Sequence, residues 1–149
     1  MQIYVDADAC PVKEEAAKVA ARHGLVIHYV SNSHMRLPFG DNVKRVVVSD
    51  GADAADNWIA EQCATRDIVV TADIPLASRA IKKGAMVISH FGKPFTQDSI
   101  GMALAMRDLM SQLRATGEAR GNHPVFTPSD RSRFLQSLEN IVQMLKRAG

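Results

Sequence analysis

Aromatic side chains and cysteines are scarce in this sequence. Aromatic residues make up only 5% of its 149 residues, which argues against a base-stacking platform of the single-strand-binding type. Cys10 and Cys63 form no CxxC motif, so we expect no zinc site and a reducing, cytoplasmic location. The apolar runs are too short for a membrane-spanning helix, so we expect no membrane partner. Acidic residues directly after the first apolar run argue against a signal peptide.

The rest of the composition is typical of a globular domain. Hydrophobic residues make up 46% and charged residues 23% of the chain, and the formal net charge is +2. Residues 1–95 hold 11 basic and 11 acidic side chains, whereas residues 96–149 hold 7 basic and 5 acidic ones. This balance excludes a histone-like binder of polyanions but leaves room for a modest contact with RNA. We expect one domain over residues 1–149, with a core over 1–95 and a helical extension over 96–149 that packs on it.

Short β-branched runs alternate with helical patterns through residue 95. We predict five strands, at residues 2–5, 26–30, 45–48, 68–71 and 86–89. Continuous apolar runs of this kind are typical of parallel strands that are buried on both faces. Helical spacing predicts a first helix with Pro11 at its first position and Gly24 as its stop. Two further helices are predicted over 52–63 and 76–81, and 31–44 is predicted to be a loop. The alternation predicts a three-layer α/β/α sandwich around a mainly parallel five-stranded sheet.

After Phe95 the pattern is helical only. Thr96 is the predicted cap of a helix that runs to about Leu113. Thr127 is followed by a proline and then by Asp130, which is typical of a capped helix start. The apolar stripe of this last helix is expected to pack on the sheet, and residues 114–125 are predicted to form a loop.

Polar side chains follow the predicted strands. They are Asp6 and Asp8 after the first strand, Ser31 and Asn32 after the second, Asp53 and Asp56 after the third, and Thr71 and Asp73 at the fourth. In open parallel sheets, ligands bind at the carboxyl ends of the strands. Asp53 and Asp56 are three residues apart, so a helix would place them on one face. We therefore expect the first strand to be central, with Asp6 where the strand order reverses.

Clustered carboxylates need a neutralising partner. Two unit charges 4 Å apart repel by about 4 kcal/mol at an effective dielectric of 20. We expect Asp6, Asp53 and Asp73 to converge and to raise the pKa of at least one of them. Oxygen ligands favour Mg²⁺ or Mn²⁺, and a cation held in this way supports hydrolysis of phosphodiesters. The competing interpretation is structural, because aspartates near helix starts often cap backbone amides.

Four motifs together resemble the YaiI/YqxD family. They are VDADACPVK, DGADAADNWI, VTADIPLA and DRSRFLQSLENI, and they span nearly the whole chain. The strand–Asp pattern is also similar to the PIN/NYN ribonuclease-type fold. That resemblance implies a metal-binding catalytic role for Asp6, Asp53 and Asp73, with Asp8 at a second acidic position and Asp56 as an added candidate ligand. NYN proteins often carry a further aspartate two residues after the third of these, and Pro75 stands there instead, which counts against a complete two-metal site.

The first hypothesis from these residues is that the protein is a metal-dependent nuclease or phosphodiesterase that acts on RNA. The candidate substrate-binding residues are Ser31, Asn32, Arg36, Thr71, Arg114 and Arg120. A second hypothesis is a phosphatase similar to the haloacid dehalogenase group, with Asp6 as nucleophile and Asp8 as acid and base. A third is a module that binds nucleic acid or nucleotides without catalysis, which Pro75 favours. Cys10 is expected to be inert, because Ala16 stands where a Cys-x5-Arg motif would need arginine.

Overall fold

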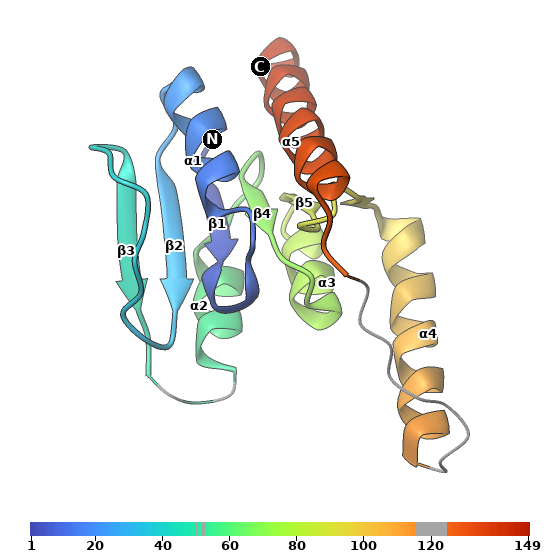
Figure 1. The fold of residues 1–149 in the computed structure, drawn as a ribbon. Helices are drawn as coiled ribbons and strands as arrows, with labels where there is room; N and C mark the ends of the chain where they lie inside the picture. Colours follow the sequence, from blue (N-terminus) through green and yellow to red (C-terminus); the bar gives the residue numbers. More distant parts are fainter. Residues whose placement is uncertain (50, 52, 116–124) are drawn as a thin grey trace.

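The protein forms a six-stranded sheet in a computed structural model that describes residues 1–49, 51, 53–115 and 125–149 (Figure 1). Its strands are β1 (Ile3–Asp6), β2 (Ile27–Ser31), β3 (Val43–Val47), β4 (Ile68–Val70), β5 (Met86–Ile88) and β6 (Pro94–Phe95). Their order is β3-β2-β1-β4-β5-β6. The first five strands pair in parallel, and β6 pairs antiparallel to β5. The predicted α/β class is confirmed, as is the central position of the first strand.

Two strands differ from the prediction. The sheet has a sixth strand, and β6 is only two residues long, which is too short to produce an apolar run in the sequence. β3 begins at Val43, two residues before the predicted start. Lys44 interrupts the apolar pattern there, yet it pairs with His28 as a regular member of the strand. An edge strand can carry such polar residues because it is only partly covered.

The helices are η1 (Ala7–Ala9), α1 (Lys13–His23), α2 (Ala54–Gln62), α3 (Ile74–Lys82), α4 (Gln97–Ala115) and α5 (Pro128–Ala148). Pro11 precedes α1 instead of opening it, because the 3₁₀ turn η1 occupies the start of this connection. Gly24 ends α1 with a φ of 66°, as its predicted role as the stop requires. α4 runs past Leu113 to Ala115, so Arg114 lies in the last turn of a helix and not in a loop.

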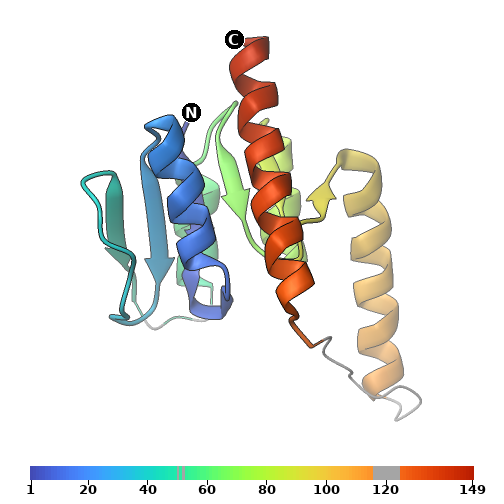
Figure 2. The ribbon, with the colours of Figure 1, turned by 45° about the horizontal axis from the view of Figure 1, so that its top comes forward.

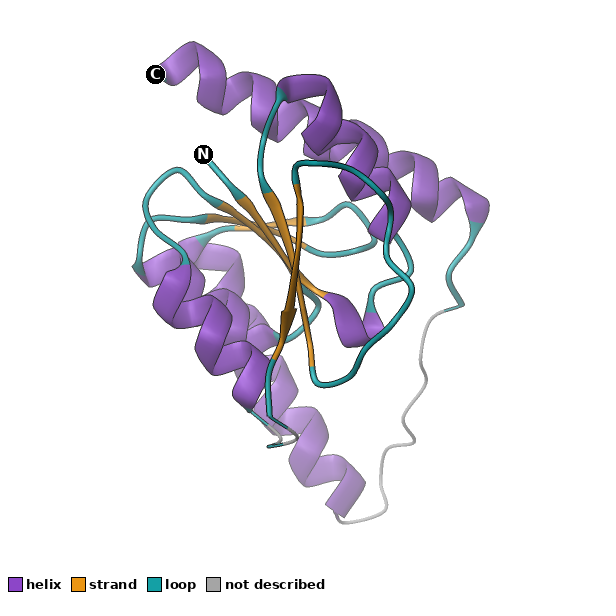
Figure 3. Ribbon diagram, turned by 90° about the vertical axis from the view of Figure 1, so that its left-hand side faces the viewer, coloured by secondary structure: helices purple, strands orange, loops and turns teal. Residues whose placement is uncertain are grey.

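Helices cover both faces of the sheet (Figure 3). α1 and α5 pack on one face, where Val5, Val70 and Phe134 belong to one buried cluster. α2 and α3 pack on the other face, where Val69, Ile59 and Leu76 belong to a second cluster. Successive residues of β4 alternate between the two clusters, as a strand buried on both sides must. The expected three layers are therefore present, and no described helix has the length and apolar character needed to cross a membrane.

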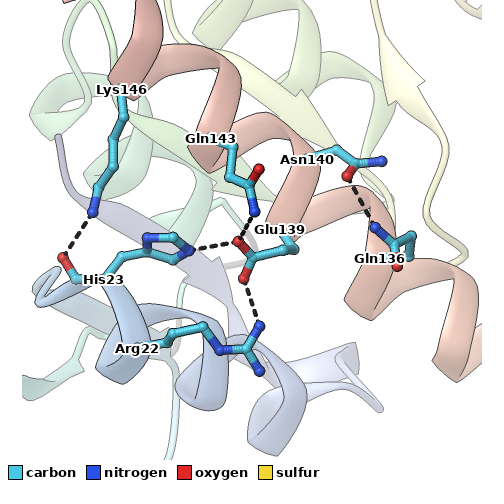
Figure 4. Close-up of polar contacts among 7 residues, drawn as sticks. All are labelled: Arg22, His23, Gln136, Glu139, Asn140, Gln143 and Lys146. Atoms are coloured by element: carbon cyan, nitrogen blue, oxygen red, sulfur yellow. Dashed lines mark hydrogen bonds and ion pairs between the residues drawn. The ribbon is translucent and has the colours of Figure 1, made fainter.

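The last helix is attached to α1 by polar contacts as well as by the core. The Glu139 carboxylate accepts from Arg22 at 2.8 Å and contacts His23 Nε2 at 2.7 Å, and Gln143 donates to it from the next turn (Figure 4). Arg131, at the start of α5, binds Glu15 of α1 at 2.8 Å. Thr127 and Asp130 form the predicted capping box at the same end. These contacts fix α5 beside α1 in the position that Figure 2 shows.

Candidate active site

The candidate site lies where the strand order reverses, between β1 and β4. Asp6 ends β1, and Thr71 directly follows β4. The Thr71 hydroxyl donates to Asp6 Oδ2 at 3.0 Å and accepts from the Asp73 backbone N–H at 3.0 Å. Thr71 is buried, so this bridge connects the ends of two neighbouring central strands away from solvent. A ligand site is expected at this position in open α/β sheets.

Capping explains only part of the acidic cluster, by which we mean Asp6, Asp8, Asp53, Asp56 and Asp73. Asp73 is the N-cap of α3, and its Oδ1 accepts from the Leu76 backbone N–H at 2.8 Å. Asp6 and Asp53 also occupy N-cap positions, but the described residues show no capping hydrogen bond to either side chain. The structural interpretation therefore accounts for Asp73 and leaves Asp6 and Asp53 without a capping role.

Asp8 links the ends of the first two strands. Its Oδ2 accepts from the Asn32 backbone N–H at 3.0 Å, just after β2. The Ser31 hydroxyl is buried and donates to the Ser33 carbonyl at 2.6 Å. Ser31 and Asn32 thus hold the loop that begins at this edge of the sheet, and Asp8 itself is exposed.

Asp53 and Asp56 enter the site from α2. Asp53 is exposed at the helix start, and Asp56 is half-buried one turn later. Burial raises the pKa of Asp56 to about 6, with further contributions from the negative charges of Asp73, Asp6 and Asp53. The Arg79 guanidinium of α3 acts in the opposite direction but does not cancel them. Asp56 therefore interacts electrostatically with Asp6, at the end of β1, and with Asp73, which follows β4.

Asp6 is affected in the same way. Burial raises its pKa, and the charges of Asp73 and Asp8 raise it further, while the hydrogen bond from Thr71 lowers it. The four ion pairs found among the described residues involve Glu139, Glu15 and Asp130, and none includes a member of the acidic cluster. Asp6 and Asp56 thus each carry a raised pKa to which the charge of Asp73 contributes, whereas the convergence of Asp6, Asp53 and Asp73 on one point stays a prediction.

The donor chemistry of the acidic cluster suits a hard cation, but the cluster is not a closed metal cage. Over residues 1–49, 51, 53–115 and 125–149, no three His, Cys, Asp or Glu side chains are placed to hold a metal ion together. Mg²⁺ usually keeps several waters and binds through one or two carboxylates plus substrate phosphates. The residues therefore fit a hydrated Mg²⁺ or Mn²⁺ held by carboxylate oxygens, and they do not form a preassembled three-ligand site.

Among the described residues, no ion pair joins a predicted basic residue to the acidic cluster. Arg36 is exposed in the loop after β2, next to Met35, whose carbonyl accepts from Arg45 in the middle of β3. Arg114 lies in the last turn of α4, and Arg120 lies outside the described residues. Cys10 is buried, and burial raises the pKa of its thiol to about 11, which agrees with the expected inert cysteine.

Sequence reasoning missed Arg79, whose positive charge lowers the pKa of Asp56. Arg79 Nη1 donates to the Asn57 side chain at 2.7 Å and so connects α3 to α2. No motif identified it, because its place depends on how the two helices pack against each other. The only available signal was its position in the helix that follows Asp73.

Comparison with known proteins shows the family. The family model described as "Uncharacterized BCR, YaiI/YqxD family" matches residues 4–144. The chain belongs to the YaiI/YqxD family. The resemblance carried by the four motifs is thereby confirmed, and the acidic cluster lies within the matched region.

Close relatives of the family cover the chain almost from end to end. A UPF0178 protein of Parvibaculum lavamentivorans is 63% identical over 98% of this chain and 96% of its own length. A UPF0178 protein of Rhodospirillum rubrum is 55% identical over 99% of both chains. One from Mesorhizobium japonicum is 57% identical over 95% of this chain and 91% of its own. These names state no activity, and no solved structure matches the chain, so the PIN-like character of the fold stays a prediction.

Proposed function

We propose that the protein is a cytoplasmic, divalent-cation-dependent phosphodiesterase that cleaves RNA at the acidic cluster. The observation that supports this best is the group of carboxylates at the reversal of strand order, which no ion pair of the described residues neutralises. Mutual repulsion of this kind destabilises the folded state, and carboxyl groups with raised pKa values are typical of functional sites. A bound cation removes the repulsion and gives the cluster a function.

The chain's own residues have distinct tasks in this proposal. Thr71 orients Asp6 through its hydrogen bond, and the start of α3 orients Asp73. These two carboxylates would hold Mg²⁺ or Mn²⁺, with Asp56 facing them from α2. When bound, such a cation clamps a phosphate and makes water a better nucleophile. RNA as the substrate is supported by the resemblance to PIN/NYN nucleases and by the basic excess of residues 96–149.

The test measures cleavage of a single-stranded RNA with and without Mg²⁺ or Mn²⁺. Asp6→Asn and Asp73→Asn keep the side-chain shape, and asparagine still caps a helix, so both variants should fold. Each should lose more than the roughly 10- to 100-fold that removal of a residue supporting a metal ligand costs. The double variant should lose little more than either single one, because one missing ligand already disables the site. Asp41→Asn, an exposed aspartate just before β3, should leave cleavage unchanged.

The same variants separate the alternatives. A phosphatase would show a phosphorylated Asp6 after incubation with a small phosphomonoester, and Asp73→Asn would matter less. A binding module would show no turnover, and its asparagine variants would bind RNA as well as or better than wild type, because negative charge has been removed. RNA cleavage that survives both substitutions in repurified protein would place the active site elsewhere.

A further inference from the structure

Helix α4 presents an apolar seam that remains exposed in the described part of the chain. Met102, Met106 and Leu109 are 72%, 52% and 47% exposed. Between residues 105 and 113 of the described helix, no side chain is buried and seven of nine are exposed. Figures 1 and 2 both show α4 extending past the sheet, so that its C-terminal half lies beyond the core.

The inner face of α4 is a separate surface. Ile100 is buried with Leu76 and Ala77 of α3, and Leu104 continues that face one turn later. With about 100° of rotation per residue, the seam formed by Met102, Met106 and Leu109 points to the opposite side of the helix. Contact with α3 therefore leaves the seam open. Helices of this length are marginal in water unless a face is packed, so the distal half of α4 lacks the usual source of stability.

The spacing of the seam identifies the kind of partner. Its residues are four and then three positions apart, which is the 3.5-residue repeat that helices use to pair with one another. Such a seam is narrower than the apolar stripe of a helix packed on a sheet. The corresponding stripes of α1, α3 and α5 are already buried in the core. A second copy of α4 is the partner helix that this chain itself supplies.

Two α4 seams complement each other when they run antiparallel. A twofold axis between Arg107 and Asp108 places Met106 of one copy against Leu109 of the other, and the reverse. Arg107 and Asp108 point away from the seam, about 130° from its centre on either side. Ala103 and Ala105, beside the seam, are small and uncharged. No like charges meet in this arrangement, and the two helix dipoles oppose each other favourably.

We propose that the protein forms an antiparallel homodimer through Met102, Met106 and Leu109 of α4. One helix pair buries less surface than the roughly 800 Å² per partner of a standard interface. The dimer should therefore depend on concentration, with dissociation in the micromolar range. This inference does not depend on the proposed function, because it involves no residue of the acidic cluster.

Sedimentation velocity from low micromolar to submillimolar protein tests the dimer. Wild type should shift from monomer to dimer, and Met106→Glu and Leu109→Glu should each raise the dissociation constant at least about tenfold, or 1.4 kcal/mol. Both sites are exposed, so at concentrations where wild type is monomeric the far-ultraviolet circular dichroism of the variants should match that of wild type. The matched control is Phe39→Glu. Phe39 is 103% exposed in the loop before β3, which is the edge strand opposite β6, and its loss should leave the dimer intact. A monomer at every concentration, or a dimer lost only in Phe39→Glu, overturns the proposal.

Introduced thiols test the antiparallel register. Both native cysteines are buried, so they do not compete for disulfide formation. A mixture of Met106→Cys and Leu109→Cys proteins should form mixed disulfide dimers under mild oxidation, because the axis places position 106 against position 109. Each variant alone should cross-link much less. A parallel pair would reverse this result, since each variant alone would then cross-link most readily, and that outcome would overturn the register.

Discussion

Asp56 is the residue whose titration should make the stability of the protein depend on the acidic cluster. Its pKa is about 6 in the folded protein, above the value near 3.9 of an unfolded chain. The folded state therefore binds more protons between these two values, and the free energy of unfolding falls as pH rises from about 4 to about 6. Above about pH 6 the free energy of unfolding carries the full electrostatic penalty, because Asp56 is then charged beside Asp73 and Asp6.

Asp56→Asn should remove this penalty. We expect the variant to be more stable than wild type at pH 8 by about 1 kcal/mol or less, since solvent screens a partly exposed carboxylate. The advantage should disappear near pH 4, where Asp56 is protonated in both states. Urea unfolding at the two pH values measures it. Asp41→Asn, at an exposed position outside the cluster, should show no such pH dependence.

Single residues also show where prediction from sequence stops. Asp6 and Asp73 could be placed together because each follows a strand, and parallel strands end at one edge. Arg79 could not be placed, because its contact with Asn57 arises from the packing of α3 against α2. The bridging role of Thr71 was missed for a related reason: the sequence identified a polar side chain, but not that its hydroxyl joins Asp6 to Asp73.

Among the elements, α5 is held beside α1 in part by Glu139. Hydrogen bonds from Gln143 and His23, and the charges of His23 and Arg22, lower the pKa of this carboxyl (Figure 4). A lowered folded pKa gives stability that is present above the unfolded value near 4.3 and is lost as pH falls below it. The contact therefore stabilises the attachment of α5 at neutral pH and not in acid.

Glu139→Gln should weaken this attachment. Hydrogen bonds to a charged group contribute about 1.5–3 kcal/mol, so we expect a loss of about 2 kcal/mol in the free energy of unfolding at pH 7. The loss should shrink below pH 4, where wild type is itself protonated. Denaturant unfolding at both pH values checks this, with Glu61→Gln, an exposed glutamate of α2, as the matched variant. A loss that is equal at pH 7 and pH 3 would contradict the electrostatic explanation.

Element boundaries were predictable where a local signal sets them. Gly24 and the capping box of Thr127 mark helix ends through backbone geometry that the sequence encodes directly. β6 and the C-terminal extension of α4 were not predicted, because neither has a strong periodic pattern. The sequence predicted the helix that carries the α4 seam, but not that the seam is exposed, because a sequence does not show which apolar face of a helix is packed.

The topology of the domain determines which carboxylates meet. The order β3-β2-β1-β4-β5-β6 places β1 beside β4, and this pairing joins residues 65 positions apart at the Thr71–Asp6 bond. The aspartates after the first strand, together with the rule that ligands bind where the strand order reverses, were enough to predict that this strand is central. The distances within the acidic cluster were not predictable, because they depend on how far α2 and the sheet edge approach each other, and the described residues stop short of a three-ligand arrangement.

Binding of Mg²⁺ should stabilise the folded protein and so connect its stability to the proposed site. A ligand that binds only the folded state adds about 1.4 kcal/mol at ten times its dissociation constant. For a domain of this size that corresponds to a rise of about 3–6 °C in Tm.

Asp6→Asn should change the Tm differently in the absence and in the presence of Mg²⁺. It should raise the Tm of the metal-free protein, because it removes a carboxylate whose pKa is raised by burial and by Asp73, and it should abolish the shift with Mg²⁺. Thermal melts with and without Mg²⁺, with NaCl at equal ionic strength as the salt control, measure both effects. A purely structural Asp6 would instead give a lower metal-free Tm in the variant, and an equal Mg²⁺ shift in wild type and Asp6→Asn would remove this carboxylate from the cation site.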